Sequence, residues 1–256
     1  MRNPDRETVF KFKRFEVTNR LSAMKVGTDG VLLGAWCLSG DERQPAIEQF
    51  NASYPERILD VGAGTGLIAL MMAQRFPSAK ISAVEIDHLA AEEAKANFYS
   101  SPWSDRLSLW EVDFNNFPKN NTQFDLIVSN PPFFTNGALP SDSTRLLARH
   151  ESSLTIDALL GNSKQLLTPN GAICLILPAD REDDLQFKAI ANHLNISKLT
   201  RVTTVGRKPP QRILAELRHN NDISSPLIVD TISIHDGKGG FTKEYSSLVK
   251  DFYLKF

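Results

Sequence analysis

Short apolar runs alternate with amphipathic stretches through the middle of the chain. The runs predict strands at residues 58–61, 80–85, 107–112, 124–129 and 172–177, and the stretches predict helices from residue 67, at 153–167 and at 181–194. Regular alternation of strands and helices is typical of a mostly parallel sheet covered by helices. The last run is apolar nearly without a break, which indicates a strand buried on both faces. We therefore expect a doubly wound α/β sheet.

The C-terminal part of the chain shows a different pattern. Residues 197–205 and 211–218 alternate between apolar and polar positions around a turn, which predicts a hairpin-like pair with an antiparallel strand at the sheet edge. Residues 228–234 suggest a further strand, and residues 245–254 suggest a short amphipathic helix.

A glycine-rich turn links the strand at 58–61 to the helix that follows. It begins at Asp60 and places its glycines at Gly62, Gly64 and Gly66. Glycines let the backbone approach a ligand at the carboxyl end of a strand. The spacing differs from the G-x-G-x-x-G of dinucleotide sites, and Asp60 would repel phosphate but suit the cationic amino-acid part of S-adenosylmethionine. A plain tight turn is the alternative interpretation.

Acidic residues end the next two predicted strands. Glu85 lies about 20 residues beyond the loop, where an acid can bind both ribose hydroxyls of a nucleotide. Asp113 could accept the adenine amino group, and Phe114 could pack on the adenine ring. Taken alone, each acid could equally well be a solvated residue at the end of a strand. Together with Asp60 they predict a bound S-adenosylmethionine.

A polar turn, Lys25 to Gly30, precedes an apolar helix near the N-terminus. Thr28 and Asp29 resemble a helix N-cap pair. A helix placed before the first strand of such a sheet packs beside the methionine end of the cofactor. Lys25 or Thr28 is therefore expected to touch the cofactor carboxylate.

The strand at 124–129 leads into Asn130-Pro131-Pro132-Phe133. Proline fixes φ and stiffens this segment. The Asn130 side-chain carbonyl and the Pro131 backbone carbonyl can each accept a hydrogen from a planar amino group, and Phe133 offers a face on which an aromatic base can stack. The tetrapeptide predicts a transferase that acts on amino nitrogen.

Composition narrows the cellular setting. The net charge is −1, and the two cysteines, Cys37 and Cys174, show no spacing typical of metal ligands. We see no apolar leader and no apolar run long enough to span a membrane. We expect a monomeric cytoplasmic protein that binds neither a metal nor a membrane.

Basic residues are concentrated in three places, which are the first 25 residues, residues 145–150 and residues 201–212. The first 25 residues hold seven basic and three acidic side chains, interleaved with Phe10, Phe12 and Phe15. Aromatic and basic residues together suit RNA, although a hairpin with buried phenylalanines is the alternative. The candidate RNA-binding residues are Lys11, Lys13, Arg14, Arg145, Arg149, Arg207 and Lys208.

The order and spacing of these motifs resemble the bacterial tRNA(Val) adenine-37 N6-methyltransferase family. The resemblance also includes Ser100-Ser-Pro-Trp103, Tyr245 and the closing Phe252-Tyr-Leu254, and it covers roughly residues 10 to 256. It implies a Rossmann-like methyltransferase sheet, with residues 57–256 as the S-adenosylmethionine-dependent domain and residues 1–56 as a basic segment and helix that pack on it as one compact unit.

The resemblance implies methylation of N6 of adenine 37 in the anticodon loop of tRNA(Val). Three other activities remain open at this point. They are methylation of guanine N2 in ribosomal RNA, methylation of glutamine N5 in a protein, and RNA binding without catalysis. A nicotinamide dehydrogenase is disfavoured by the glycine spacing.

Overall fold

The structure is a computed structural model. It describes residues 9–22, 25–39, 55–119, 122–132, 154–220 and 227–255. Three residues singled out above, Phe133, Arg145 and Arg149, lie outside these ranges. All other candidate residues lie within them.

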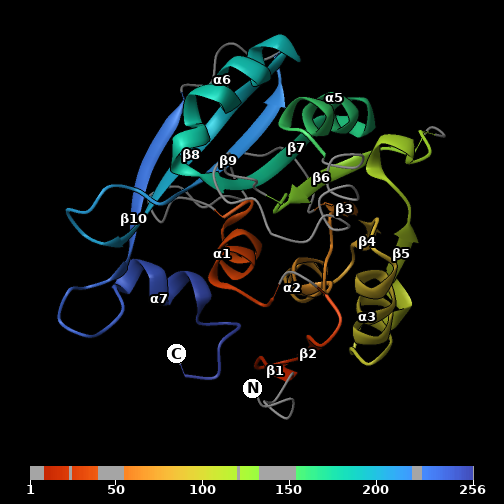
Figure 1. The fold of residues 1–256 in the computed structure, drawn as a ribbon, viewed down its shortest axis with the longest axis horizontal. Coiled ribbons are helices and arrows are strands. Elements are labelled where there is room, and N and C mark those ends of the chain that lie inside the picture. The colour runs from red at the N-terminus through yellow and green to blue at the C-terminus, as the bar shows by residue number, and fades with distance from the viewer. Residues whose placement is uncertain are drawn as a thin grey trace, which may run out of the picture.

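An eight-stranded sheet runs through the described residues in the order β10-β8-β9-β7-β6-β3-β4-β5 (Figure 1). Its strands are β3 (Arg57–Val61), β4 (Lys80–Glu85), β5 (Leu107–Glu111), β6 (Phe124–Ser129), β7 (Leu167–Pro178), β8 (Leu194–Val205), β9 (Arg212–His219) and β10 (Ile228–His235). All neighbouring pairs are parallel except the two that β9 forms with β7 and β8.

Helices cover both faces of the sheet. Figure 1 shows α1 (Thr28–Trp36), α2 (Leu67–Arg75), α3 (His88–Tyr99) and α7 (Lys243–Val249) on one face, and α5 (Ile156–Leu166) and α6 (Glu182–Ala191) on the other. Short 3-10 turns lie at Ser104–Arg106 (η1), Phe114–Asn116 (η2) and Ala179–Arg181 (η3). One buried apolar cluster lies under each helical layer. This architecture confirms the predicted doubly wound α/β fold.

The central strands explain why their sequences are apolar. β3 pairs with β4 on one side and β6 on the other, and helices cover both of its faces. Ile58, Leu59 and Val61 are therefore buried whichever way they point. The carboxyl ends of β3, β4 and β6 are brought to one edge of the sheet, which is where the chemistry-bearing residues were predicted.

The strand positions agree with the sequence except in the C-terminal part. The antiparallel strand β9 lies between β7 and β8 and not at the edge, because β8 and β10 extend the sheet beyond it. The edge strand is β10, and it runs parallel to β8. β7 begins at Leu167, five residues earlier than expected from residue 172, with an irregularity in its pairing between Phe124 and Leu126.

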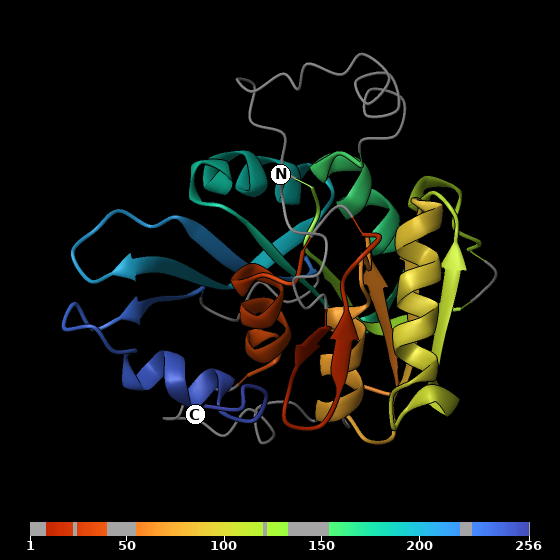
Figure 2. The same ribbon diagram turned by 60° about the horizontal axis from the view of Figure 1, so that its bottom comes forward.

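The N-terminal segment forms an antiparallel ribbon of β1 (Val9–Lys11) and β2 (Glu16–Thr18). Phe12 and Phe15 are buried, as the hairpin interpretation requires, whereas Phe10 is exposed. The ribbon packs against the end of the chain (Figure 2), and the Lys13 N–H donates to the Phe252 carbonyl at 2.8 Å. The division into residues 1–56 and 57–256 stays a prediction.

Across the residues that the structure describes, each helix is too short or too polar to cross a lipid bilayer.

Candidate active site

The loop from β3 to α2 uses left-handed backbone at each of its three glycines. φ is 76° at Gly62, 55° at Gly64 and 78° at Gly66, and residues with a Cβ rarely adopt this conformation. A Cβ at Gly66 would lie 2.4 Å from the Phe98 ring, whereas one at Gly62 would meet no described atom within 4 Å. The loop is therefore closed against α3 at Gly66 and open at Gly62, where a ligand can approach the backbone.

The side chain of Asp60 is fully buried beside this loop. Its Oδ2 accepts a hydrogen bond from the Ala69 N–H in the first turn of α2, at 3.0 Å. Its Oδ1 has no hydrogen-bond partner among the described residues. Burial raises the pKa of Asp60 to about 7, an effect that the Ala69 hydrogen bond opposes and the Glu85 charge increases. The predicted contact between Asp60 and a ligand stays a prediction.

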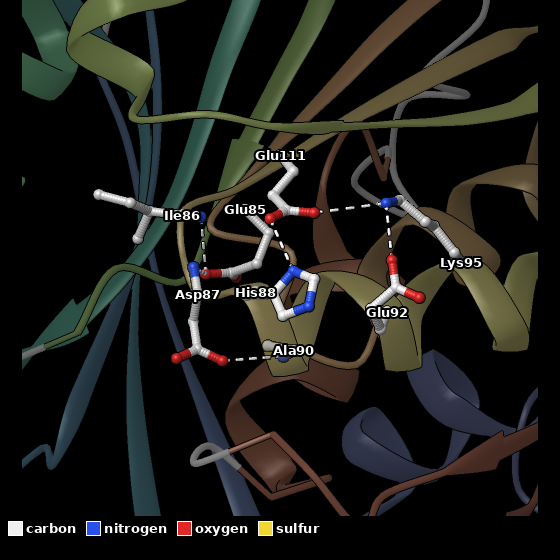
Figure 3. A network of polar contacts seen from close by, with 8 residues as sticks. All are labelled: Glu85, Ile86, Asp87, His88, Ala90, Glu92, Lys95 and Glu111. Carbon is white, nitrogen blue, oxygen red and sulfur yellow. Dashed lines mark hydrogen bonds and ion pairs between the residues drawn. The ribbon is translucent and has the colours of Figure 1, made fainter.

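Glu85 joins the end of β4 to the glycine loop. Its Oε2 accepts the Gly64 N–H at 2.8 Å. Its Oε1 accepts the Ile86 and Asp87 N–H groups, each at 2.9 Å (Figure 3). The side chain is nearly buried. A carboxylate has about four acceptor positions, so the three backbone contacts leave about one, on Oε2. Glu85 is thus held rigidly at the ligand side of the loop.

A network of exposed charged side chains lies next to Glu85 (Figure 3). His88 Nδ1 is 2.8 Å from Glu111 Oε1, and the Lys95 ammonium donates to Glu92 at 2.9 Å and to Glu111 at 3.4 Å. The hydrogen bond from His88 is the main cause that lowers the pKa of Glu111. His88, Glu92 and Glu111 could together face a cation, but the Lys95 ammonium already contacts both carboxylates. The network therefore ties the start of α3 to the end of β5.

Asp113 and Phe114 follow β5 at the same edge. The Asp113 side chain accepts the Asn115 N–H at 2.9 Å and so begins the turn η2. The Phe114 ring is buried and lies 6.3 Å from the Phe117 ring, within the core under α5. Sequence reasoning missed the exposed apolar side chain of Ile86, which directly follows Glu85 and is 49% exposed. An apolar residue between two acids at a strand end was the available signal.

Residues 18–22 are fastened to α3 close to the glycine loop. The buried Glu93 carboxylate accepts the N–H groups of Arg20, Leu21 and Ser22, the last two at 2.9 Å. Asn97 donates to the Thr18 and Thr65 carbonyls and accepts the Thr18 N–H, each at 2.9 Å. Ser22 Oγ lies 3.6 Å from the Cβ position of Gly64. Residues 18–22, which we call the covering segment, therefore lie over the loop, an arrangement that sequence reasoning missed.

The polar turn before α1 differs in detail from its prediction. Lys25 Nζ donates to the Asn19 and Ser22 carbonyls, at 3.1 and 3.2 Å, which stabilises the covering segment. The N-cap is Gly27, without a side-chain hydrogen bond, so the predicted cap pair of Thr28 and Asp29 is wrong.

The helix already begins at Thr28, so Thr28 and Asp29 lie in its first turn and not at the cap position. Asp29 Oδ2 instead accepts from Arg212 Nε at 2.8 Å. Thr28 lines a cavity that β8–β10 and α7 also border. The predicted cofactor contacts of Lys25 and Thr28 stay predictions.

Asn130 and Pro131 follow directly from β6. Ser129 pairs with Val61 in register, and Ser129 Oγ donates to the Val61 carbonyl at 2.8 Å. Asn130 and Gly62 are therefore the first residues beyond two adjacent strands, which lie about 4.8 Å apart in a sheet. Pro131 is buried and Pro132 is exposed. The segment predicted to be catalytic thus begins beside the open part of the glycine loop, and its role stays a prediction.

Within the described ranges, the candidate RNA-binding residues occupy two exposed places. Lys11 is 3.1 Å from Glu16 in the N-terminal ribbon, and Lys13 Nζ donates to the Lys250 carbonyl at 2.6 Å, with the exposed Arg14 next to it. Arg207 and Lys208 lie in the exposed turn between β8 and β9. That turn leaves the same edge of the sheet as Asn130.

Comparisons with known proteins agree with this geometry. The family model of the methyltransferase small domain matches residues 46–189. A tRNA1(Val) (adenine(37)-N6)-methyltransferase from Porphyromonas gingivalis is 44% identical over 250 residues, which are 96% of this chain and 94% of the relative. A protein of the same name from Vibrio campbellii is 39% identical over 247 residues, with 96% and 95% covered.

Solved structures share the fold at low identity. A predicted O-methyltransferase from Agrobacterium tumefaciens superposes with a TM-score of 0.64 at 17% identity, over 88% of this chain and 96% of the other. A glycopeptide N-methyltransferase in complex with S-adenosylmethionine gives a TM-score of 0.51 at 13% identity, over 75% and 94%.

Proposed function

Because the chain belongs to the tRNA1(Val) (adenine(37)-N6)-methyltransferase family, we propose that it transfers a methyl group from S-adenosylmethionine to N6 of adenine 37 in tRNA(Val). The observation that carries the proposal is the position of Asn130, one residue beyond β6 and beside the start of the glycine loop. Acceptors for an amino group and a loop open to a ligand are thereby placed next to each other.

The residues at the loop fit S-adenosylmethionine. This cofactor supplies an electrophilic methyl group on a positively charged sulfur. The open position at Gly62 admits a ligand close to the backbone. The buried Asp60 carboxylate, with one oxygen lacking a partner among the described residues, favours a positive charge nearby. The free acceptor position of Glu85 suits a ribose hydroxyl, and the exposed Ile86 side chain, next in sequence, suits one face of an adenine ring.

Asn130 and Pro131 would orient the target nitrogen. Their carbonyl oxygens accept the two N6 hydrogens, which holds the amino group so that the nitrogen lone pair points toward the glycine loop. The nitrogen forms its bond to the methyl carbon as the bond to sulfur breaks, and the proton leaves afterwards to solvent. Because orientation supplies most of the rate, no strong general base is required. The adenine must leave the stacked anticodon loop to reach this position.

The direct test incubates the protein with labelled S-adenosylmethionine and total RNA from a strain that lacks the gene. We expect label in N6-methyladenosine of the tRNA fraction after nucleoside analysis. Label in N2-methylguanosine of ribosomal RNA would contradict the proposed substrate. Absence of label from RNA would contradict the proposal as well.

A further inference from the structure

A cavity lies along the same edge of the sheet, away from the glycine loop. It has a volume of about 810 Å³ and is bordered by β1, the first turn of α1, the ends of β8 and β10, and the C-terminal segment around α7. Neither the glycine loop nor Asn130 lines it. Figures 1 and 2 show α1, β10 and α7 gathered at this end of the molecule.

Aromatic rings line this cavity on two sides. On one side the rings of His235, Phe241 and Tyr245 form a stack, with centroids 5.0 and 5.3 Å apart. On the other, the Phe10 ring lies 6.1 Å from the Tyr253 ring. Phe241 is 48% exposed and Phe10 is 38% exposed, so part of each ring is accessible to a ligand.

The charged residues around the cavity are mainly basic. Lys11, Arg212 and Lys255 line it, and the single carboxylate among the lining residues belongs to Asp29. Asp29 is already neutralised by Arg212 at 2.8 Å. The ion pair between Lys11 and Glu16 is largely exposed on both sides and is therefore easily exchanged for another anion. The rim suits phosphate groups.

The cavity lies close enough to Asn130 for a single RNA chain to reach both. Val202 of β8 pairs with Arg212 of β9, Arg212 pairs with Pro178 of β7, and β7 pairs with β6 up to Ser129. Three strand spacings separate β8 from β6, which is roughly 14 Å. A nucleotide close to the target in the same loop can cover that separation.

We propose that this cavity binds an unpaired nucleobase of the RNA substrate other than the methylated adenine. The base packs against the exposed edges of the Phe241 and Phe10 rings, and Lys11 and Lys255 contact the adjoining phosphates. Aromatic rings with basic neighbours are the usual means of holding single-stranded RNA. The inference rests on the proposed function and adds a second contact, which would help to draw the anticodon loop open.

The test compares Phe241→Ala with Phe187→Ala, since Phe187 is 72% exposed on α6, outside the cavity. We expect the Kd for tRNA to rise about 5- to 150-fold in Phe241→Ala, the effect of losing one base-stacking contact. The Kd for S-adenosylmethionine should stay as in the wild type, whereas the thermal unfolding midpoint should fall by a few degrees because two ring contacts are lost. Phe187→Ala should leave all three values unchanged.

A second variant reports on the contact directly. Phe241→Trp keeps an aromatic face, so its indole fluorescence should be quenched when unmethylated tRNA is added. Unchanged tRNA affinity in Phe241→Ala, or unquenched fluorescence in Phe241→Trp while tRNA is bound, would overturn the inference. A change of oligomeric state in Phe241→Ala would also overturn it, because a second copy would then be the occupant. Absence of N6-methyladenosine with the wild type would instead refute the proposed function.

Discussion

The two ends of the sheet's carboxyl edge hold their side chains in different ways. Around the glycine loop, the carboxylates of Asp60, Glu85 and Glu93 are all buried or nearly so, and each accepts backbone N–H groups. In the cavity at the other end, Phe241 and Phe10 are half exposed. Methyl transfer needs atoms fixed in position, whereas stacking tolerates different bases and small displacements. The difference suggests that one end performs chemistry and the other holds the substrate.

The largest effect should come from Asn130→Ala. This change removes one acceptor for the target amino group but leaves the glycine loop and Glu85 in place. We expect kcat to fall about 10²- to 10³-fold, comparable to the loss of one preorganised hydrogen bond in other active sites. The Kd for S-adenosylmethionine, measured by calorimetry, should stay within about twofold, and tRNA affinity should change less than in Phe241→Ala. Retained turnover would show that Asn130 does not orient the nitrogen.

Glu93→Ala should loosen the backbone that lies over the glycine loop. The change removes the acceptor for three backbone N–H groups of residues 20–22, so we expect a loss of about 2–4 kcal/mol in the free energy of unfolding. Because the covering segment would be closed in fewer molecules, the Kd for S-adenosylmethionine should rise about tenfold.

A neighbour on the same helix provides the control for Glu93. Glu92 is exposed and contacts the Lys95 ammonium, so Glu92→Ala should cost about 0.5 kcal/mol or less. Urea unfolding with and without S-adenosylmethionine measures both quantities. Equal losses in the two variants would mean that the Glu93 contacts do not hold the covering segment.

The sequence predicted the surroundings of the glycine loop far better than the cavity at the other end of the sheet. Residues 80–85 and 124–129 form strands with the predicted bounds, because apolar runs with clear ends depend on local pattern. Asp60, Glu85 and Asn130 could be placed at one edge, since parallel strands end together. The position of β9 inside the sheet depends on which strands pair, and no local pattern encodes that choice.

Neither the covering segment nor the cavity could be predicted from local sequence patterns. Glu93 reads as one more acid on an amphipathic helix, and only its orientation in the fold brings it to residues 20–22. The cavity gathers residues as far apart as Phe10, Arg212 and Phe241. Phe10 was noted with Phe12 and Phe15 as an RNA-binding candidate or a core residue, and the structure separates it from the two buried phenylalanines.

The smallest effect is a pH dependence centred on Asp60. Its pKa of about 7 exceeds the value of an unfolded chain, about 3.9. The folded state therefore binds the proton more tightly, and the free energy of unfolding falls as pH rises from about 4 to above 7. Between pH 6 and pH 8 the fall from this group should be about 1.4 kcal/mol.

Asp60→Asn keeps an oxygen for the Ala69 N–H and carries no charge at any pH, so it should remove this fall and be more stable than the wild type at pH 8. Urea unfolding at pH 6, 7 and 8 measures the difference. Parallel curves for the two proteins would show that Asp60 is already ionised at pH 6. The charge beside the glycine loop would then be held at little cost in stability.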